Sequence, residues 1–500
     1  MSPRTADMQF SPVESALARS RLGVPAVMFF VLAAAAPLTV VAGGATTAYA
    51  VTGVLGIPVA YLLIASVLAV FSVGYIAMSR RIVNAGAFYT YVARGLGRVP
   101  GVGAAFVAVT AYAALLFGML GGVGAVLSAW LDTRFETTVW WWALALAGAL
   151  VVGFLGVRKV DLNGRVLAVL LIGEVAVSVV VSIVAVAHPA GGAVTYDTLS
   201  PGVLIGSGAG AALVVAITGF VGFEQTAVFA EESRDPRRTV PRATHLAIAV
   251  PGLLYAFGSW AMSVATGPDR IVEQSRAHGT ELLFTIAGPH VAPFLIDLGH
   301  LLLITSLLAG AMAFHNTTAR YLFSLGRERV LPASLGHTSP ATRAPKVAST
   351  ALTAASALVI VWYAINGLDP IVHLFFWLTV LGGLGVLILM VATSMAVLLY
   401  FHRDADRDGL TVWHRRIAPA LALIALTAIL IVTLRQFATV AGVDPTSPLR
   451  WLLPAVFGVV AVLGVAWALR IRATNPDVYA GIGLGAAGTQ AQPHATEVTS

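Results

Sequence analysis

Apolar stretches of roughly 20 residues, the length that an α-helix needs to cross about 30 Å of hydrocarbon, recur along the whole chain. No gap between them is long enough to hold a soluble domain. Hydrophobic residues make up 58% of the 500 and charged residues 11%, whereas soluble domains are roughly half apolar and a quarter charged. The sequence therefore predicts an all-α integral membrane protein with twelve spans, at about 25–50, 57–78, 100–130, 138–157, 166–187, 204–230, 244–266, 291–314, 347–366, 370–401, 417–440 and 450–470.

Positive charge is distributed unevenly between the loops. Arginine and lysine gather in alternate connections, and the connections between these are nearly free of positive charge. Cytoplasmic loops of membrane proteins carry such an excess of Lys and Arg. The net charge of +7 therefore sets the topology and does not indicate a nucleic-acid partner. Both termini are predicted to lie in the cytoplasm, in a multi-pass protein of the cell membrane.

The sequence lacks the motifs of common enzyme and nucleotide-binding sites. There is no cysteine, no GxxxxGK[ST] phosphate loop, no HExxH zinc pair and no GxSxG nucleophile elbow. We therefore expect neither an enzyme nor ATP-driven transport within this chain, and no cofactor or bound metal.

Helix-breaking residues fall inside two of the predicted spans. The first span has Pro37 followed by the run Val41–Gly44, and the sixth has Gly219 and Gly222. Proline removes a backbone donor, and each glycine costs about 1 kcal/mol relative to alanine within a helix. Unwound backbone at membrane depth is tolerated only where it lines a cavity or is buried in protein. The alternative is that the glycines serve close packing and the proline makes a simple kink.

The two interrupted spans occupy corresponding positions if the first ten spans form two sets of five with opposite topology. Broken helices at such positions indicate the central site of an inverted-repeat transporter. The predicted organisation is a cytoplasmic tail, a first repeat, a second repeat, a final pair of spans and a small, polar tail that we expect to be disordered, at 1–24, 25–200, 201–402, 403–471 and 472–500.

Carboxylates inside the spans are a second indication of a site. Burying a charge at mid-membrane costs about 3 kcal/mol or more, so an ionisable residue there marks a pathway or a paired structural site. Glu174 lies in the middle of the fifth span, as a functional or a hydrogen-bonded structural group. Glu224 in the sixth span is either a contact for a proton or ammonium group or a cap on the restarted half-helix. Asp297 is close enough to water to be a solvated helix start.

Four segments carry a resemblance to a known family, and one of them is the VAGG run at 41–44, which resembles the G-S/T-G break of that family's first helix. GFVGFEQTAVFAEESRDPRRTVPRA (219–243) closely resembles the sixth-helix signature of amino acid permeases of the amino acid–polyamine–organocation (APC) superfamily. NAGAFYTYVARGLG (84–97) resembles the loop after helix two, with Asn84 and Ala87 departing from the usual pattern. FHNTTARYLFSLGRERVLP (314–332) resembles the loop after helix eight. Together with the span layout, the resemblance covers most of residues 20–470.

The resemblance implies the LeuT-like APC fold, a five-plus-five inverted repeat with broken helices 1 and 6 and two further helices, which opens a central site alternately to each side. It implies that backbone amides of the first break hold a substrate carboxylate, that the sixth helix forms a backbone wall, and that an aromatic ring closes over the substrate. The amides that hold the carboxylate would be those of Val41, Ala42, Gly43 and Gly44, and the backbone wall would be Thr218, Gly219 and Gly222. The aromatic ring, or gate, would be Phe220, with Glu224 beside it.

Coupling to an ion gradient is a separate expectation. Some proton-coupled relatives carry a lysine in helix five, and Glu174 falls at or near that position. A carboxylate there can bind a proton or help to bind sodium, and Thr305 and Ser306 of helix eight resemble the hydroxyl pair of a sodium site. We expect a proton gradient as the driving force, with sodium as the alternative.

The predicted function is secondary active transport of amino acids across the cytoplasmic membrane, as a symporter or exchanger. A neutral, small or apolar amino acid would fit an apolar pocket, whereas a cationic amino acid or a polyamine would use Glu224 as its counter-charge. A polyamine or organic-cation exchanger and a non-transporting substrate sensor are the alternatives. The expected partners are a small-molecule substrate and membrane lipid, for a monomer or a homodimer.

Overall fold

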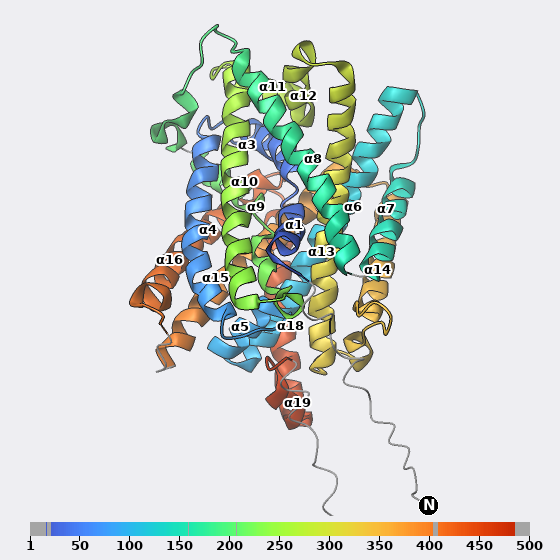
Figure 1. Ribbon diagram of the computed structural model, residues 1–500, viewed down its shortest axis with the longest axis vertical. Coiled ribbons are helices and arrows are strands. Elements are labelled where there is room, and N and C mark those ends of the chain that lie inside the picture. Colours follow the sequence, from blue (N-terminus) through green and yellow to red (C-terminus); the bar gives the residue numbers. More distant parts are fainter. Residues whose placement is uncertain (1–16, 18–21, 159, 207, 404–408, 486–500) are drawn as a thin grey trace, which may run out of the picture.

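The computed structural model describes residues 17, 22–158, 160–206, 208–403 and 409–485, and this part of the chain is a bundle of long helices (Figure 1). The prediction of an all-α membrane protein is confirmed. The α-helices are α1 (Val24–Ala34), α2 (Pro37–Thr39), α3 (Ala45–Thr52), α4 (Ile57–Ser79), α5 (Ala87–Gly95), α6 (Arg98–Phe135), α7 (Trp141–Gly156), α8 (Val160–Ala187), α9 (Ala209–Thr218), α10 (Pro236–Thr266), α11 (Ile271–His278), α12 (Leu282–Ala287), α13 (Pro293–Arg327), α14 (Lys346–Ile365), α15 (Trp377–Arg403), α16 (Ala418–Arg435), α17 (Phe437–Val440), α18 (Leu449–Thr474) and α19 (Pro476–Gly481).

Eleven helical segments among the described residues are long and apolar enough to cross a membrane. They coincide with the predicted spans except the fourth, where α7 has 16 residues. A helix of that length rises about 24 Å, less than the hydrocarbon core of about 30 Å. The chain is a multi-pass membrane protein, and the count of twelve spans stays a prediction.

The helix α13 continues past residue 314, where the sequence predicts the end of the eighth span, and reaches Arg327. This extension carries polar side chains that are buried against protein. His315 bonds Ser349 at 2.7 Å, and Arg320 is only 4% exposed. Hydropathy underestimates the helix because it cannot distinguish polar residues that face protein from polar residues that face water.

The first span is interrupted earlier than the sequence predicts. The expected break at Val41–Gly44 is wrong: Val40–Gly44 forms one wide helical turn, η1, and α1 instead ends at Ala34. Ala36 takes a left-handed conformation with φ 43° and ψ 66°. The reason is Pro37, whose ring disfavours the right-handed α conformation in the residue before it. The proline places the break, and the glycine pair only widens the helix that follows.

The sixth span breaks where the sequence predicts. The helix α9 ends at Thr218, and Gly222 has φ +130°, which residues with a Cβ atom rarely adopt. Beyond it the chain continues as two short 3-10 turns, η4 (Phe223–Ala227) and η5 (Ala230–Glu232), in place of a restarted α-helix.

The two interrupted spans pack directly on each other at the centre of the bundle. A Cβ atom at Gly222 would lie 2.6 Å from the Cβ of Ala34. One turn further along, the rings of Phe30 and Phe229 stack with centroids 4.7 Å apart. The breaks therefore meet each other, and α8, α10 and α13 pack on the first span around them.

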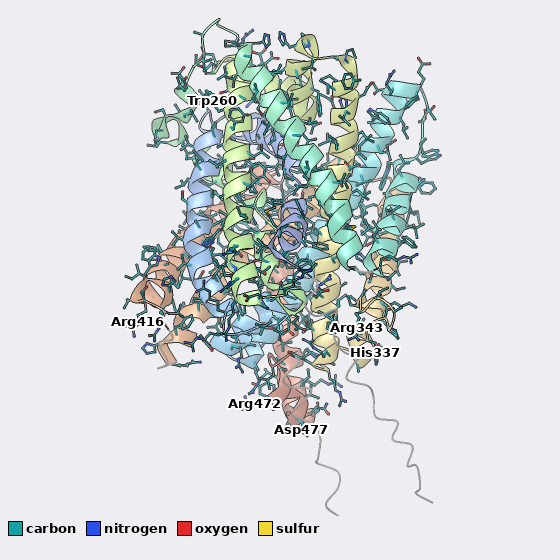
Figure 2. The ribbon with its side chains drawn as sticks, viewed as in Figure 1. Trp260, His337, Arg343, Arg416, Arg472 and Asp477 are labelled. Atoms are coloured by element: carbon teal, nitrogen blue, oxygen red, sulfur yellow. The ribbon has the colours of Figure 1, made fainter. Side chains whose placement is uncertain are left out.

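The bundle has two distinct ends, which we name by the elements that lie there. The α11 end carries α11 and α12, and the α19 end carries α5 and α19 (Figure 1). Arg343, Arg416 and Arg472 lie at the α19 end, whereas Trp260 lies toward the α11 end (Figure 2). Large apolar side chains such as Ile424 and Val462 are exposed on the outer helices, as expected for surfaces that face lipid.

The chain after the last span is partly folded. Residues 475–485 fall in the tail that the sequence predicts to be disordered, yet α19 forms there and Ile482 is 1% exposed. The remaining parts of the two predicted tails, 1–16, 18–21 and 486–500, lie outside the described residues.

Candidate functional site

A cavity of about 750 Å³ lies where the two interrupted spans meet. Its walls come from the first span, α6, α9, α13 and the wide turn η9 (Pro370–Phe376). The cavity reaches the α11 end, where the exposed side chains of Arg134 and Asp297 line its mouth. Its size falls within the roughly 300–1,000 Å³ that is usual for small-molecule pockets.

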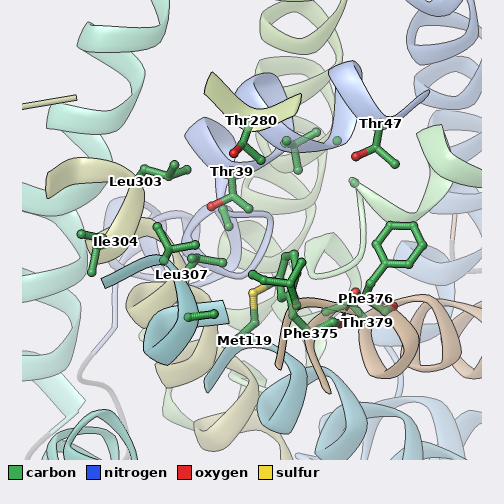
Figure 3. Close-up of a pocket in the computed structure, with 18 of the residues that line it drawn as sticks. Thr39, Thr47, Met119, Thr280, Leu303, Ile304, Leu307, Phe375, Phe376 and Thr379 are labelled. Atoms are coloured by element: carbon green, nitrogen blue, oxygen red, sulfur yellow. Dashed lines mark hydrogen bonds between the residues drawn. The ribbon is translucent and has the colours of Figure 1, made fainter. Parts of the chain in front are cut away.

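Apolar side chains cover most of the cavity wall (Figure 3). Between them lie a few hydroxyl groups, including those of Thr39, Thr47 and Thr280. A wall of this kind accommodates an apolar group and leaves a small number of polar positions to orient it. The apolar side chains labelled in the close-up are Met119, Leu303, Ile304, Leu307, Phe375 and Phe376.

Charged side chains line only the mouth of the cavity. Arg134 lies 3.5 Å from Asp297, and His300 lies 2.8 Å from Glu281. Both acidic groups therefore already have a basic neighbour. Deeper in the cavity, the lining side chains that the structure describes are uncharged.

Residues of both breaks line the cavity. Ala34, Ala35 and Ala36 line it at the end of α1, and Thr218 and Gly219 line it at the end of α9. The last carbonyl groups of a helix and the first N–H groups of the next lack partners within the helix. Several of these groups have partners in the protein: the N–H of Gly219 donates to the Ala216 carbonyl at 3.2 Å, and the Tyr255 hydroxyl donates to the Ala35 carbonyl at 3.1 Å.

The predicted site residues divide into two groups. Gly43, Gly44, Thr218 and Gly219 line the cavity. The others lie behind its wall: Val41 and Ala42 are fully buried, Gly222 packs on Ala34, and Glu224 is 1% exposed. The roles predicted for all of these residues stay predictions.

The predicted aromatic gate packs within a cluster of aromatic rings. Phe220 is buried, and its ring centroid lies 6.4 Å from that of Tyr61 and 5.6 Å from that of Tyr255. The neighbouring Val221 lines the cavity in its place. Closure of Phe220 over a substrate would require this aromatic cluster to rearrange.

Glu224 is held beneath the floor of the cavity. Tyr112 donates its hydroxyl to Glu224 Oε1 at 2.7 Å, and the backbone N–H of Gly222 donates to Oε2 at 2.9 Å. The Tyr112 ring stacks on Phe314, which itself lines the cavity. Each carboxylate oxygen therefore has a donor, and two aromatic rings lie between Glu224 and the cavity.

Glu174 lies at a junction of three spans. Ser306 of α13 donates to Glu174 Oε2 at 2.7 Å, and Thr39 of the first span donates to the Ser306 hydroxyl at 3.1 Å. Glu174 Oε1 is buried without a hydrogen-bond partner among the described residues. Thr305 is not part of this junction, because its hydroxyl bonds the Leu302 carbonyl of its own helix.

The pattern of spans and breaks does not reveal every polar group at these sites. Thr39 joins the Glu174 junction, Tyr112 bonds Glu224, and the buried Tyr61 hydroxyl lies beside Gly44 at the cavity. The only signal in the sequence is that each is a polar residue inside an apolar span. Uniformly apolar flanks give no indication of which face of the helix is turned inward.

Comparison with known proteins identifies the family. A family model described as amino acid permease matches residues 26–474 of the chain. The chain belongs to the amino acid permease family. Family and relatives are transporters, in agreement with the predicted absence of enzyme activity.

The relatives of this permease are named for different substrates. It is 28% identical over 128 residues to the low-affinity putrescine importer PlaP of Escherichia coli, covering 25% of this chain and 27% of the relative. It is 25% identical over 188 residues to the branched-chain amino acid permease BcaP of Bacillus subtilis, covering 37% of each. It is 25% identical over 260 residues to the chloroplastic cationic amino acid transporter 7 of Arabidopsis thaliana, covering 51% of this chain and 39% of the relative. The matches thus span less than half of each relative.

Buried ion pairs join α13 to the sixth span at the α19 end. Arg320 of α13 forms two hydrogen bonds with Glu232 of η5, at 2.7 and 3.1 Å, and both side chains are almost fully buried. Arg327 pairs with Glu231 in the same way, at 2.7 and 2.9 Å. Glu231 also accepts a bond from the backbone N–H of Ala85 at 2.9 Å. These contacts tie the broken sixth span to α13 and to the loop before α5.

The sequence contains a signal for these ion pairs. Arg320 and Arg327 are seven residues apart, which places them on one face of a helix. Two adjacent glutamates, Glu231 and Glu232, follow the broken sixth span directly. Opposite charges at the edge of the membrane favour such pairing, but only the fold shows which partners meet.

Proposed function

We propose that this permease is a secondary transporter of neutral, apolar amino acids that works by alternating access, and that the present conformation is open at the α11 end. The proposal rests on one observation. The two broken spans bound a cavity that reaches the α11 end, while ion pairs of η5, which follows the break in the sixth span, hold the α19 end closed. Opening the α19 end would require these pairs to separate, so the two ends need not be open together.

The arrangement of short helices supports two inverted repeats. The short helix α5 lies between α4 and α6, the second and third spans, at the α19 end (Figure 1). The short helices α11 and α12 lie between α10 and α13, the seventh and eighth spans, at the opposite end. Equivalent connections at opposite ends are what an inverted five-plus-five repeat requires. In this scheme α7 is the fourth of twelve spans.

The distribution of arginine supports a cytoplasmic α19 end. Arg343, Arg416 and Arg472 lie there, and the positive-inside rule assigns such loops to the cytoplasm (Figure 2). The cavity then faces the outside of the cell, and the two termini lie inside. This orientation fits uptake of a substrate from the medium.

The chemistry of the cavity supports a neutral substrate with an apolar side chain. A cationic side chain would need an acidic partner deep in the site, but Glu224 lies beneath the floor and Glu281 and Asp297 lie at the mouth. The branched-chain amino acids for which the relative BcaP is named agree with this assignment, whereas the putrescine for which PlaP is named does not. The α-amino and carboxylate groups would bind the backbone of the two breaks, beside Gly43 and Thr218.

Proton coupling is the driving force that the Glu174 junction favours. The carboxylate can exchange a proton where the first span meets α8 and α13, and movement of the first span would change its contact through Thr39 and Ser306. Sodium would have to replace these direct hydrogen bonds with metal contacts. In this proposal Glu224 acts as a structural cap that keeps the break open, and Phe220 closes on the substrate only after binding.

Uptake by the purified protein in liposomes tests the proposal. An inward proton gradient without sodium should drive accumulation of leucine, isoleucine or phenylalanine, and a protonophore should abolish it. Lysine and putrescine should not compete. Competition by putrescine alone would instead identify a polyamine exchanger, and binding without flux or exchange would identify a sensor.

A further inference from the structure

The segment that follows α19 is embedded in the α19 end of the permease. Residues 481–485 read GIGLG, and Ile482, Gly483 and Gly485 are buried although they lie at the end of the described chain. Arg98 of α6 steadies the helix before them, since its guanidinium donates to the Ala480 carbonyl at 2.9 Å. The segment thus occupies a defined surface at this end.

A carboxylate anchors this segment through two backbone groups. The N–H groups of Gly483 and Gly485 donate to the two oxygens of Glu328, at 3.0 and 2.9 Å. Both glycines have positive φ, +78° and +58°, which permits their N–H groups to converge on one anion. Burial raises the pKa of Glu328 above its usual range, although these two donors and Arg327 act in the opposite direction.

The embedded segment lies directly on the contacts that close the α19 end. A Cβ atom at Gly485 would lie 2.6 Å from Asn84 Nδ2 and 3.4 Å from Arg327 Nη2. A Cβ atom at Gly483 would lie 3.1 Å from the Cβ of Ala93 in α5. The segment therefore touches α13, α5 and the loop before α5, and it covers the arginine that pairs with Glu231.

We propose that residues 481–485 are a releasable latch, and that their docking on Glu328, Asn84 and Ala93 holds the α19 end closed. The inference rests on the proposed alternating access, because it names what regulates opening at one end. Docking excludes water from the Arg327–Glu231 pair, whose arginine side chain is 2% exposed. Ion pairs in contact with water contribute little to stability. Release of the segment would therefore make the Arg327–Glu231 pair easier to separate.

The composition of the latch favours reversible docking. Three of its five residues are glycine. Glycine loses more conformational freedom on ordering than other residues, and this loss opposes docking. Two N–H groups hold the latch on Glu328. Release would expose a single fully buried large side chain, that of Ile482, whereas release of a longer apolar segment would expose several.

Two glycine substitutions distinguish release of the latch from a general loss of folding. Gly485→Ala adds a Cβ atom that meets Asn84 and requires a strained positive φ. Gly481→Ala is the matched control, since a Cβ atom there meets no atom within 4 Å. Glu328→Gln is an independent release variant of the same size: its NH2 group replaces one acceptor oxygen, so one of the two backbone N–H groups loses its hydrogen bond. It remains informative if Gly485→Ala fails to fold.

The natural absence of cysteine permits a direct measurement of opening. Ser324 is buried in α13, one helical turn from Arg320 and Glu328, and Ser324→Cys reports access from the α19 side. In full-length protein in liposomes, Gly485→Ala and Glu328→Gln should raise the rate of labelling by a membrane-impermeant maleimide several-fold over the Gly481→Ala control.

The outcome distinguishes the latch from the proposed function. Unchanged labelling in a folded Gly485→Ala or Glu328→Gln protein would overturn the latch, whatever the transport result. Faster labelling in a protein that takes up none of the amino acids tested would support the latch and count against the assigned substrate. Thermal unfolding of each variant establishes that the protein is folded.

Discussion

Gly222 of the sixth span faces Ala34 of the first, and a Cβ atom on Gly222 would lie 2.6 Å from the Ala34 Cβ. The same Cβ atom would lie 3.2 Å from the Val31 carbonyl oxygen. The two interrupted spans thus touch at a point that admits no side chain. Movement of one break must therefore displace the other, which is how a substrate bound between them can affect both.

Gly222→Ala should destabilise the permease and reduce uptake. The strained φ of +130° costs about 1–3 kcal/mol for a residue with a side chain, and the contact with Ala34 adds to this cost. Thermal unfolding in detergent and initial uptake rates measure the two effects. Gly458→Ala in α18 is the control, because a Cβ atom there meets no atom within 4 Å. Equal unfolding temperatures for the two variants would contradict this account.

The lengths of the apolar stretches were sufficient to predict most of the spans, and the glycines predicted the break in the sixth. The first break shows where such reasoning fails. Both Pro37 and the glycine pair weaken the helix, and composition alone does not show which one sets the break. The steric effect of Pro37 on Ala36 decides it, whereas Gly43 and Gly44 remain helical.

Contacts between distant parts of the chain could not be predicted from local pattern. Thr39 and Ser306 are separated by 267 residues, and Arg320 and Glu232 by 88. The charge inside its span marked Glu174 and resemblance supplied Ser306, but the role of Thr39 depends on where the first span turns. A small-residue segment such as 481–485 resembles a disordered tail unless its docking surface is known.

Glu174→Gln should abolish accumulation driven by a proton gradient while leaving exchange of substrate intact. The amide can still bond Ser306 but cannot gain or lose a proton. Uptake under a pH gradient and counterflow without a gradient measure the two activities. Ser306→Ala should weaken coupling, whereas Thr305→Val should not, because the Thr305 hydroxyl bonds only within its own helix. Gradient-driven accumulation in the Glu174→Gln protein would exclude this residue as the proton carrier.

Glu224→Gln should lower stability more than it lowers coupling. One of the two donors, the Tyr112 hydroxyl or the Gly222 N–H, would face the amide NH2 group and lose its acceptor. An unsatisfied buried polar group costs about 1–3 kcal/mol. Tyr112→Phe removes a single hydrogen bond and provides the comparison. If Glu224→Gln keeps its unfolding temperature but loses gradient-driven uptake, Glu224 carries a proton and is not only a cap.

Glu232→Gln should shift the permease away from the conformation that is open at the α11 end. The substitution leaves the buried guanidinium of Arg320 without its charge partner, and removing one member of a buried pair costs about 3–5 kcal/mol. This cost falls on the conformation in which the pair is formed. A cysteine placed at Thr280, which lines the cavity, should then react more slowly with a maleimide added at the α11 side. Asp235→Asn is the control, because it breaks an Arg238 pair that is largely exposed and contributes little. Equal labelling rates in the two variants would show that the Arg320–Glu232 pair does not set the balance between the two conformations.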